Sequence, residues 1–420
     1  MVVMSLRMRH AFIMAICCIY YGVNASTLYD MPGVYAYGSG IIADPTQPND
    51  SIITIAASNI ILDLGDQAFE QYSLNTVPNF DGIIIQSGAS NVTIRNGTIQ
   101  KLTGRGIVIE DGCSEVRFEN ITISDCTNYG IAALGESGIS EVGIYNCSIT
   151  DIKQGDQLSA GVYLQNCSKI IIDRVTVQGF EQASETDCMG FRFVSANAFQ
   201  MTDCKAIQHM SKQLSAGYYF DSSNDGIVKN CLVYSCITLG DAASLSAGFY
   251  LTGCQRIWIS KSQSALNMSL SGQSIGFYSE SGSRNIFDNL VAQLNTASQN
   301  AAGFWFINEQ RSYINNNMIR GNESSKAQAA GIKLEGCSLC CITENTLINN
   351  IGAESFGIVD AASPSSSVIT LNYAFNNSKN YQVSYSNGVT LPILNGSLTQ
   401  SDPGLPLHVA GLLDNISINP

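Results

Sequence analysis

The chain has 420 residues and a formal net charge of −13, and only 13% of its residues are charged. This acidity argues against a nucleic-acid partner, because binding to phosphates needs a basic surface. Pro is scarce, with 9 residues, and Gly is common, with 37, which favours a folded chain with small-residue turns over a disordered one. No phosphate-binding loop, dinucleotide-binding fingerprint or nucleophile elbow is present, so no motif implies a cofactor.

The first 25 residues have the pattern of a secretory signal. Arg7, Arg9 and His10 precede an apolar stretch over 11–23, which ends in Val-Asn-Ala with Ala25 last. We expect cleavage after Ala25, with an uncleaved N-terminal anchor as the alternative. The stretch is too short for a comfortable membrane span, and no other segment has 18 uninterrupted apolar residues. The mature chain is therefore expected to have no transmembrane span and to be secreted or displayed at the cell surface, in the periplasm or outside the cell.

Residues 26–80 are expected to form an N-terminal cap and the first coils of a repeat. The segments 51–55 and 59–64 are rich in Ile and Leu and are strand-like. From residue 81 to residue 390 a short strand recurs, and each copy opens on a Gly followed by apolar, variable and apolar residues. These glycines are 24 to 31 residues apart: Gly82, Gly106, Gly130, Gly161, Gly190, Gly217, Gly248, Gly276, Gly303, Gly331 and Gly357. Such a period is typical of a solenoid, in which each unit buries its apolar face against its neighbours.

Each repeat contains three strands. In the Gly strand, the first and third residues after Gly are predicted to point inward and the second outward. A second apolar strand follows, as in 170–172, and then a corner with Asn at a nearly fixed phase. The corner residues are Asn96, Asn120, Asn146, Asn230, Asn289, Asn316, Asn345 and Asn372, interrupted by Arg174, Asp203 and Lys261. Asn tolerates left-handed backbone, and its amide can bond the same residue one coil away. A third strand leads into a polar loop.

Three parallel strands per coil predict a single-stranded, right-handed parallel β-helix of about 11–13 coils. Hairpins are excluded because equivalent strands recur only after a full turn of chain, and helical solenoids because a 3.6-residue period is missing. The repeat fades after about residue 391, so 391–420 are expected to be a C-terminal cap or tail.

The chain resembles right-handed β-helix repeat proteins of the pectin-lyase-like superfamily. The resemblance rests on the Gly-Ile-Ile-Ile run at Gly82, the Asn-Val-Thr-Ile-Arg-Asn-Gly-Thr-Ile segment 91–99 and the Asn corner, and it covers roughly 50–390. It implies that the Asn corner joins the second and third sheets and that the Gly strands, with their flanking loops, form the substrate groove. Members of this superfamily cleave or bind acidic polysaccharides, or serve as surface proteins and adhesins. Hydrolases of the polygalacturonase type carry paired Asp residues and a Gly-His-Gly motif, and this chain lacks both.

The outward position, two residues after each repeat Gly, carries a row of aromatic and basic side chains. Along the stack this row is Tyr163, Arg192, Tyr219, Tyr250, Tyr278, Trp305 and Lys333. Neighbouring coils are about 4.8 Å apart, so the row extends over several coils. Aromatic rings with polar tips suit sugar rings, and Arg192 and Lys333 could hold sugar carboxylates or sulfates. The alternative is a stacking ladder that stabilises the sheet, or a second small core under the loops.

Carboxylates occur two positions further along the same face. Asp221 and Glu280 are two coils apart, or about 9.6 Å along the axis. That separation is near the upper end of the range of about 6.5–9.5 Å for an inverting carboxylate pair. Lys333, which shares its strand and face with Glu335, would be the base of a lyase-type reaction. Asp221, Glu280 and Lys333 are thus the catalytic candidates, against the simpler interpretation that acids at strand ends are solvated.

Twelve cysteines follow residue 26, and Cys147, Cys204 and Cys231 recur at one phase of the repeat. We expect mostly buried free thiols, although Cys204 and Cys231 on adjacent coils would be within disulfide range. Cys337 and Cys340 have metal-like spacing, but no second cluster or His accompanies them, and no calcium-type acid cluster is present. No metal site is predicted.

These observations predict an exported β-helix protein that recognises a polysaccharide or surface glycan on the outward face of the Gly strands. A polysaccharide lyase or glycoside hydrolase is one alternative. A structural or adhesive surface protein without a sugar site is another.

Overall fold

The structure is a computed structural model that describes residues 27–38, 41–43, 51–71, 78–153, 158–180, 186–360, 367–383, 390–391, 398–400, 408–409 and 418–419. The predicted signal peptide, residues 1–25, lies outside the described residues, as does most of the segment 391–420. Within the described residues no helix is long and apolar enough to cross a membrane.

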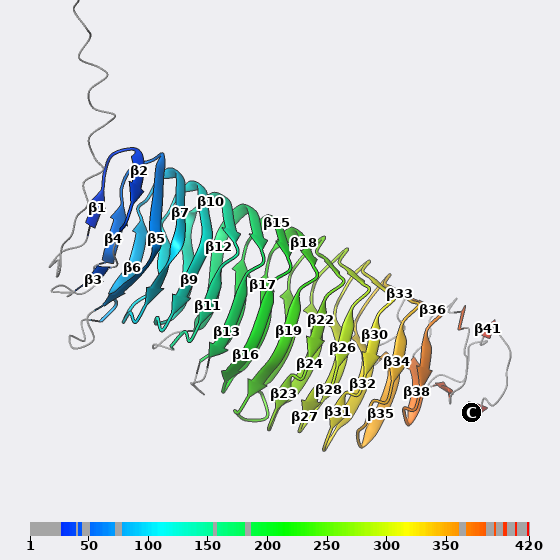
Figure 1. The fold of residues 1–420 in the computed structure, drawn as a ribbon. Coiled ribbons are helices and arrows are strands. Elements are labelled where there is room, and N and C mark those ends of the chain that lie inside the picture. The colour runs from blue at the N-terminus through cyan, green and yellow to red at the C-terminus, as the bar shows by residue number, and fades with distance from the viewer. Residues whose placement is uncertain are drawn as a thin grey trace, which may run out of the picture.

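The chain winds into a right-handed parallel β-helix, as the repeat predicts. Strands stack along one axis from β1 at one end to β38 near the other (Figure 1). Every inter-strand pairing in the stack is parallel, and each strand pairs with its equivalent one coil before and one coil after, as β17 does with β14 and β20. The stack therefore has three long faces, called here the first, second and third sheets in chain order.

The first sheet contains the Gly strands. Its members are β1 (Thr27–Tyr29), β4 (Ser51–Ile55), β6 (Asp81–Ile85), β8 (Ile107–Ile109), the first parts of β10 (Tyr129–Tyr145) and β12 (Ser159–Asp173), β14 (Cys188–Val194), β17 (Leu214–Asp221), β20 (Leu245–Thr252), β24 (Gln273–Glu280), β28 (Ala301–Ile307), β32 (Gln328–Glu335), β35 (Glu354–Asp360), β38 (Lys379–Val383), β40 (Leu398–Gln400) and β42 (Ile418–Asn419).

The second sheet contains β2 (Gly33–Ala36), the first parts of β5 (Ile60–Gln71), β7 (Ser90–Gln100) and β9 (Ser114–Ser124), the second parts of β10 and β12, β15 (Asn197–Thr202), β18 (Asn224–Lys229), β21 (Trp258–Ser260), β25 (Ile286–Asp288), β29 (Tyr313–Asn315), β33 (Cys341–Thr343) and β36 (Val368–Thr370).

The third sheet contains β3 (Ile41–Ala43), the second parts of β5, β7 and β9, β11 (Ser148–Thr150), β13 (Thr176–Phe180), β16 (Lys205–Ser211), β19 (Leu232–Thr238), β22 (Gln263–Ala265), β26 (Val291–Gln293), β30 (Met318–Arg320), β34 (Thr346–Ile348) and β37 (Tyr373–Phe375). Three short strands extend its edge, β23 (Met268–Ser269), β27 (Thr296–Ala297) and β31 (Glu323–Ser324), and β39 (Thr390–Leu391) pairs separately with β41 (His408–Val409).

The core is one continuous apolar column inside the coils. The residue after each repeat Gly points into it, as predicted, and in five successive coils this residue is aromatic: Phe191, Tyr218, Phe249, Phe277 and Phe304. Their rings stack with centroids 4.7–4.8 Å apart and nearly parallel planes. This spacing equals the distance between coils, so the aromatic stack helps to fix the register of the first sheet.

The Asn corner between the second and third sheets is two columns rather than one. Asn96, Asn120 and Asn316 occupy exposed corner positions with left-handed backbone, and Asn120 Nδ2 donates to Asn96 Oδ1 over 3.0 Å. Asn345 and Asn372 come one residue later, where the side chain points into the core. The prediction that placed these two in the same ladder is wrong, because the left-handed positions in their coils are Glu344 and Leu371.

Buried amide ladders run inside the C-terminal half of the solenoid. One joins the side chains of Asn317, Asn345 and Asn372, with Nδ2 to Oδ1 distances of 2.8 and 2.9 Å. A second joins Asn267, Asn295, Asn322, Asn350 and Asn377, with distances of 2.7–2.8 Å. Each amide donates to one neighbour and accepts from the other, so the polar groups are satisfied within the core.

All twelve cysteines after residue 26 are free thiols, eleven of them buried and Cys341 half-buried, in agreement with the prediction. Cys147, Cys204 and Cys231 share the inward position that follows the corner. Burial raises the pKa of the Cys147 thiol to about 11 and that of Cys254 to about 12, so these groups are inert at neutral pH.

Glu309 is a buried carboxylic acid in this core. It accepts hydrogen bonds from the Ser279 hydroxyl, from Ser312 Oγ over 2.6 Å and from Asn285 Nδ2 over 3.2 Å. Burial nevertheless raises its pKa above the ordinary value of 4.5, against these hydrogen bonds, which lower it. The folded state therefore holds the Glu309 proton more tightly than the unfolded chain does.

Glu309 is expected to make the fold less stable as pH rises. Its contribution is fully present below the unfolded pKa and is lost as pH rises through the raised folded pKa. We expect the stability of the wild type relative to Glu309→Gln to increase when the pH is lowered from 7 toward 4.5. Urea unfolding of both proteins across this range measures it, and a difference that is independent of pH would contradict the raised pKa.

Candidate functional site

The outer surface of the first sheet is shaped by the repeat glycines. A Cβ added to Gly276 would lie 2.6 Å from the carbonyl oxygen of Gly303 on the next coil and 2.9 Å from Ala292 of the third sheet. The Gly thus points inward, as the residue after it does, and the ladder skips it: Ile275 pairs with Ala302, and Phe277 with Phe304. Two consecutive inward positions place the residue before the Gly on the outside. A second outward column therefore lies beside the aromatic row, which the period-two interpretation of the strand missed.

That second column supplies the floor on which the aromatic row packs. Its members are mostly small: Ala160, Met189, Ala216, Ala247, Ile275, Ala302, Ala330 and Phe356, all buried. One cluster joins Ala160, Met189 and Ala216 to Tyr129 and Tyr163, and another joins Ala302, Ala330 and Phe356 to Tyr278 and Trp305. Tyr250 packs against both clusters. The outer face of the first sheet thus carries a thin apolar layer of its own.

The structure brings the predicted row together in the predicted order, but it buries much of it. Consecutive pairings place Tyr163, Arg192, Tyr219, Tyr250, Tyr278, Trp305 and Lys333 on neighbouring strands. Tyr163, Tyr278, Trp305 and Lys333 expose only 9, 7, 5 and 7% of their surface. Arg192, Tyr219 and Tyr250 are half-buried. The two ends of the row therefore resemble the packed ladder, and the accessible part lies at its centre.

The tyrosines at the centre of the row stack on one another. The ring centroids of Tyr219 and Tyr250 are 5.0 Å apart, and those of Tyr250 and Tyr278 are 4.7 Å apart, with interplanar angles of 15° and 25°. Burial raises the pKa of the Tyr219 and Tyr250 hydroxyls, so both remain protonated and able to donate a hydrogen bond. This is a flat, half-buried aromatic surface with hydroxyl groups.

Arg192 lies between two of these rings. Its guanidinium carbon is 5.1 Å from the Tyr163 centroid and 5.3 Å from the Tyr219 centroid. Its Nε and Nη1 atoms are buried, and neither has a hydrogen-bond partner in the described part of the chain. A buried guanidinium normally satisfies its donors, so two unpaired N–H groups mark a place where an acceptor would be bound.

Carboxylates lie close to Arg192. Burial raises the pKa of Asp187, and the nearby Arg192 charge opposes that rise. Asp221 ends the neighbouring strand, and its Oδ1 accepts a hydrogen bond from Ser222 Oγ over 2.8 Å. Neither carboxylate forms an ion pair with Arg192 in the structure, so the guanidinium keeps its positive charge for another group. Asp187 was not predicted as a site residue; the recurrence of outward residues three positions before the Gly was the available signal.

The other end of the row is closed by Lys333. Its Nζ lies 3.7 Å from the Trp305 ring centroid and 2.7 Å from Glu335 Oε1, and the side chain is buried. Tyr278 Oη donates to Glu280 Oε2 over 3.1 Å. Lys333 is thus positioned by a ring and a carboxylate, and its charge is already compensated.

The three catalytic candidates do not meet at one point. Thr252 lies between Asp221 and Glu280, since it pairs with both. Ile307 likewise separates Glu280 from Glu335, the partner of Lys333. The spacing of two coils, about 9.6 Å, holds as predicted, but Asp221 and Glu280 face the surface from separate strands.

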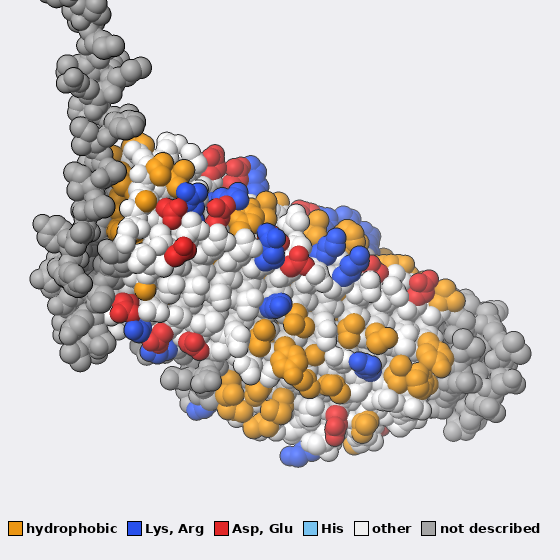
Figure 2. Space-filling view, viewed as in Figure 1, with side chains coloured by type: hydrophobic (Ala, Val, Ile, Leu, Met, Phe, Trp, Pro, Cys, Tyr) orange, Lys and Arg blue, Asp and Glu red, His pale blue; other side chains and the backbone are white. Residues whose placement is uncertain are grey.

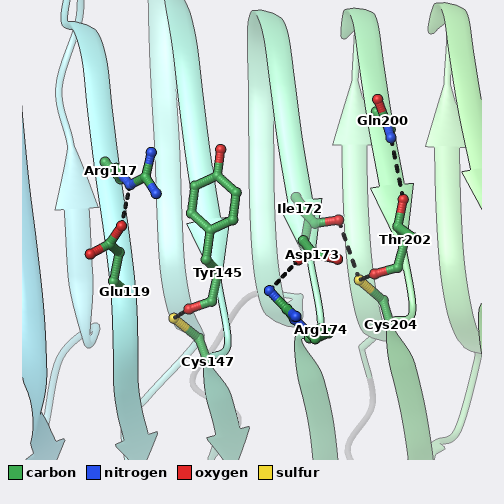
Figure 3. A network of polar contacts seen from close by, with 10 residues as sticks. All are labelled: Arg117, Glu119, Tyr145, Cys147, Ile172, Asp173, Arg174, Gln200, Thr202 and Cys204. Carbon is green, nitrogen blue, oxygen red and sulfur yellow. Dashed lines mark hydrogen bonds and ion pairs between the residues drawn. The ribbon is translucent and has the colours of Figure 1, made fainter.

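Two hollows lie on other faces of the solenoid. One crosses the second sheet and is lined by Asn91, Arg117, Glu141, Tyr145 and Lys169 among others. Figure 3 shows Arg117 and Glu119 of β9 beside the Tyr145 ring, whose centroid is 4.4 Å from the guanidinium carbon. The second hollow, of about 540 Å³, lies at the following corner among Arg174, Asp203, Lys205, Asn230 and Lys261. Arg174 pairs there with Asp173 over 2.7 Å, as Figure 3 also shows.

The described residues offer no metal centre. No three or more His, Cys, Asp or Glu side chains among them are placed to hold an ion. His209 was expected at the start of a loop, but it lies within β16 and is fully buried, and burial lowers its pKa to about 3. That expectation is wrong because the third strand of this coil is longer than its apolar pattern indicates.

Two family models match the chain. One, described as right handed beta helix region, matches residues 81–263, and the other, described as periplasmic copper-binding protein (NosD), matches residues 184–393, which is half of the chain. The chain belongs to the right-handed parallel β-helix family. Its second half also belongs to the NosD family, although the described side chains do not provide the donor set that a copper site would need.

Solved structures of similar winding have little sequence in common with this β-helix protein. The A-module of the mannuronan C-5 epimerase AlgE4 from Azotobacter vinelandii is 14% identical, with a TM-score of 0.40 and 91% of each chain covered. The periplasmic alginate epimerase AlgG is 12% identical, with a TM-score of 0.39, over 86% of this chain and 84% of that one. A mannuronic acid specific family 6 lyase from human gut microbiota is 10% identical, with a TM-score of 0.36, over 88% and 87%. No curated protein matches the sequence.

Proposed function

We propose that this β-helix protein is exported and binds an acidic polysaccharide on the outer face of the first sheet, with Arg192 at the centre of the site. One observation carries the proposal. The Arg192 guanidinium is held between the rings of Tyr163 and Tyr219 with two buried N–H groups that have no partner in the described chain.

A sugar carboxylate or sulfate would complete this arrangement. Guanidinium donors form bidentate hydrogen bonds with planar anions, and the flanking rings hold the fork in one orientation before the ligand arrives. Because less side-chain freedom is lost on binding, a pre-positioned arginine binds more tightly than a mobile one. Asp187 and Asp221 could accept hydrogen bonds from sugar hydroxyls beside the anion.

Tyr219 and Tyr250 would supply the surface for the sugar rings. They are the half-buried aromatic residues next to Arg192, and their stacked rings form a flat surface with hydroxyl donors. Tyr278, Trp305 and Lys333 are more deeply packed, so their role in the proposal is to support this surface. The ligand would then extend along the axis of the solenoid, across neighbouring coils.

An extracytoplasmic location agrees with two separate features. The N-terminal 25 residues have the pattern of a cleaved signal, and the NosD family that matches the second half of the chain is described as periplasmic. Export to the periplasm or beyond would also place the protein where polysaccharides occur.

Arg192→Ala is expected to weaken binding of an oligouronate by about 10- to 100-fold, the scale of one charged hydrogen-bonding group. Isothermal titration calorimetry with oligogalacturonates and oligomannuronates measures this. Arg117→Ala is the matched control, since Arg117 also lies over a tyrosine ring but is paired with Glu119 on the second sheet. Wild-type affinity in Arg192→Ala, or equal losses in both variants, would contradict the proposal.

The same incubations, scored for released oligosaccharide, test the enzymatic alternatives. Product that increases with time, and that is eliminated by Asp221→Asn, Glu280→Gln or Lys333→Ala, would replace binding by lyase or hydrolase activity. Uronate binding without product would leave Arg192 as the centre of a recognition site.

A further inference from the structure

Arginines occupy the corner between the first and second sheets in three successive coils. Arg256, Arg284 and Arg311 are exposed and have left-handed backbone with φ of 56°, 57° and 56°. Their backbone N–H groups bond the next coil, Arg256 to the Ser283 carbonyl and Arg284 to the Gln310 carbonyl. They are therefore stacked one coil apart, at about 4.8 Å.

Neighbours in this corner column compensate each other in other coils. Asn91 Nδ2 donates to Asn59 Oδ1 over 2.9 Å, and Lys169 pairs with Glu141 over 2.6 Å. Asp225 forms two hydrogen bonds with Arg256, of 2.5 and 2.8 Å. The next two members of the column have no such arrangement.

Arg284 and Arg311 are like charges on adjacent coils. Neither guanidinium forms an ion pair, a hydrogen bond or a ring contact within the described residues. Like charges directly opposite each other destabilise a sheet. In a chain of net charge −13 with 21 basic residues, this placement is unfavourable for the isolated protein and favourable only when an anion lies against it.

Exposed aromatic rings accompany the arginines. Two residues after each of the three arginines, the outward position of the second sheet carries Trp258, Ile286 and Tyr313, which pair in register. Trp258 and Tyr313 expose 44 and 40% of their surface, far more than the aromatic row of the first sheet does. A column of guanidinium groups thus runs beside a column of apolar and aromatic side chains.

Basic residues continue on the far side of the same sheet. The corner hollow is lined by Arg174, Lys205 and Lys261, with only Asp203 opposing them in its lining. In Figure 2, Lys and Arg side chains gather with apolar ones along the upper ridge of the molecule, over β15 to β33. Among the faces described, this ridge combines positive charge with exposed aromatic surface.

We infer that the outer face of the second sheet is a second binding surface, for a linear acidic glycan that lies along the solenoid axis with its anionic groups on Arg284 and Arg311. Trp258 and Tyr313 would contact the sugar rings. The face shares no residue with the Arg192 site, so the two assignments can fail independently.

A glycan fits this face better than a nucleic acid does. Duplex DNA carries one charge per about 1.7 Å, and a chain of net charge −13 repels so dense a polyanion at long range. A polyuronate or sulfated glycan presents fewer charges, separated by sugar rings. That pattern suits two free guanidinium groups about 4.8 Å apart next to exposed rings.

The test compares Arg284→Asn/Arg311→Asn with Arg320→Asn/Lys326→Asn. Asn is compatible with the left-handed corner, and the control removes two exposed positive charges elsewhere, at the end of the third-sheet strand β30 and after it. Binding to polygalacturonate and dextran sulfate is measured over a range of salt concentrations, with dextran as the uncharged probe. Both pairs are also made in the Arg192→Ala background, so that the first-sheet site cannot mask the result.

We expect Arg284→Asn/Arg311→Asn to lose about tenfold or more in affinity and to show a weaker salt dependence, with Trp258→Ala reducing affinity as well. Circular dichroism and the thermal midpoint should be unchanged, because these side chains are exposed. Equal losses in the control, no loss in the test variant or no binding of either acidic polymer by the wild type would each overturn the inference. Tighter binding of single-stranded DNA than of either glycan would overturn the ligand class.

Discussion

Asn345→Ala is expected to lower the free energy of unfolding by about 3 kcal/mol or more. The Asn345 side chain accepts hydrogen bonds from the Asn317 backbone N–H (3.1 Å) and side-chain amide (2.8 Å). It donates to the Ile314 carbonyl over 3.0 Å and to Asn372 Oδ1 over 2.9 Å. Ala would leave these groups in the core without partners, and each unsatisfied group costs about 1–3 kcal/mol.

Asn316→Ala is the control for this prediction, since Asn316 is at the exposed corner position one residue before the buried Asn317. Ala there loses a residue that tolerates left-handed backbone, and we expect a cost of about 1 kcal/mol. Chemical unfolding of both variants measures the difference. Equal destabilisation by Asn316→Ala and Asn345→Ala would show that the ladder inside the core does not carry the stability assigned to it.

This pair of residues also shows where the sequence was sufficient and where it was not. The recurrence of Asn at nearly constant spacing predicted a sharp corner in every coil, and the corner is there. The spacing could not distinguish Asn316 from Asn345, because the loops that close each coil vary in length and the phase drifts by one residue. Whether an Asn is in the exposed column or the buried one depends on register with the neighbouring coil, and the hydrogen bonds set that register.

The first-sheet face could be predicted in order but not in depth. The repeat Gly fixed which residues follow one another along the axis, and the row from Tyr163 to Lys333 lies as expected. Its burial could not be predicted, because it depends on the residue before each Gly. A strict period of two assigns that residue to the interior, whereas the irregularity at the Gly turns Ala216 and Ala302 outward, where they form the floor beneath the rings.

The features that support function come from differences between coils, which the repeat itself does not contain. Arg192 interrupts a row of tyrosines, and its unpaired donors are evident only once Tyr163 and Tyr219 are seen on either side of it. Arg284 and Arg311 are similarly ordinary corner residues in sequence, and become informative because their neighbours in the column leave them uncompensated. A solenoid fixes the spacing of such residues at one coil, so a single substitution per coil is enough to place charges in line.

Gly276→Ala is expected to destabilise the fold by about 3 kcal/mol, although it adds a single methyl group. That methyl would lie 2.6 Å from the Gly303 carbonyl oxygen, 2.9 Å from Ala292 Cβ and 3.1 Å from Asn295 Nδ2. The first contact is with backbone and the third with the amide ladder, so neither can yield without disturbing the next coil. Because a Cβ at Gly248 would meet the Gly276 carbonyl in the same way, the glycines form a continuous column that excludes side chains.

The control for the Gly column is Gly38→Ala, where an added Cβ meets nothing within 4 Å. We expect a change within about 0.5 kcal/mol there, since Ala also reduces the freedom of the unfolded chain. Urea unfolding followed by circular dichroism measures both variants, and solenoids can lose coils separately, so the midpoint of the main transition is compared. A Gly276→Ala protein as stable as Gly38→Ala would mean that neighbouring coils can separate locally at little cost. The first-sheet face could then not be the rigid surface on which Arg192 and its flanking rings depend, and the proposed binding site would lose its pre-positioned arginine.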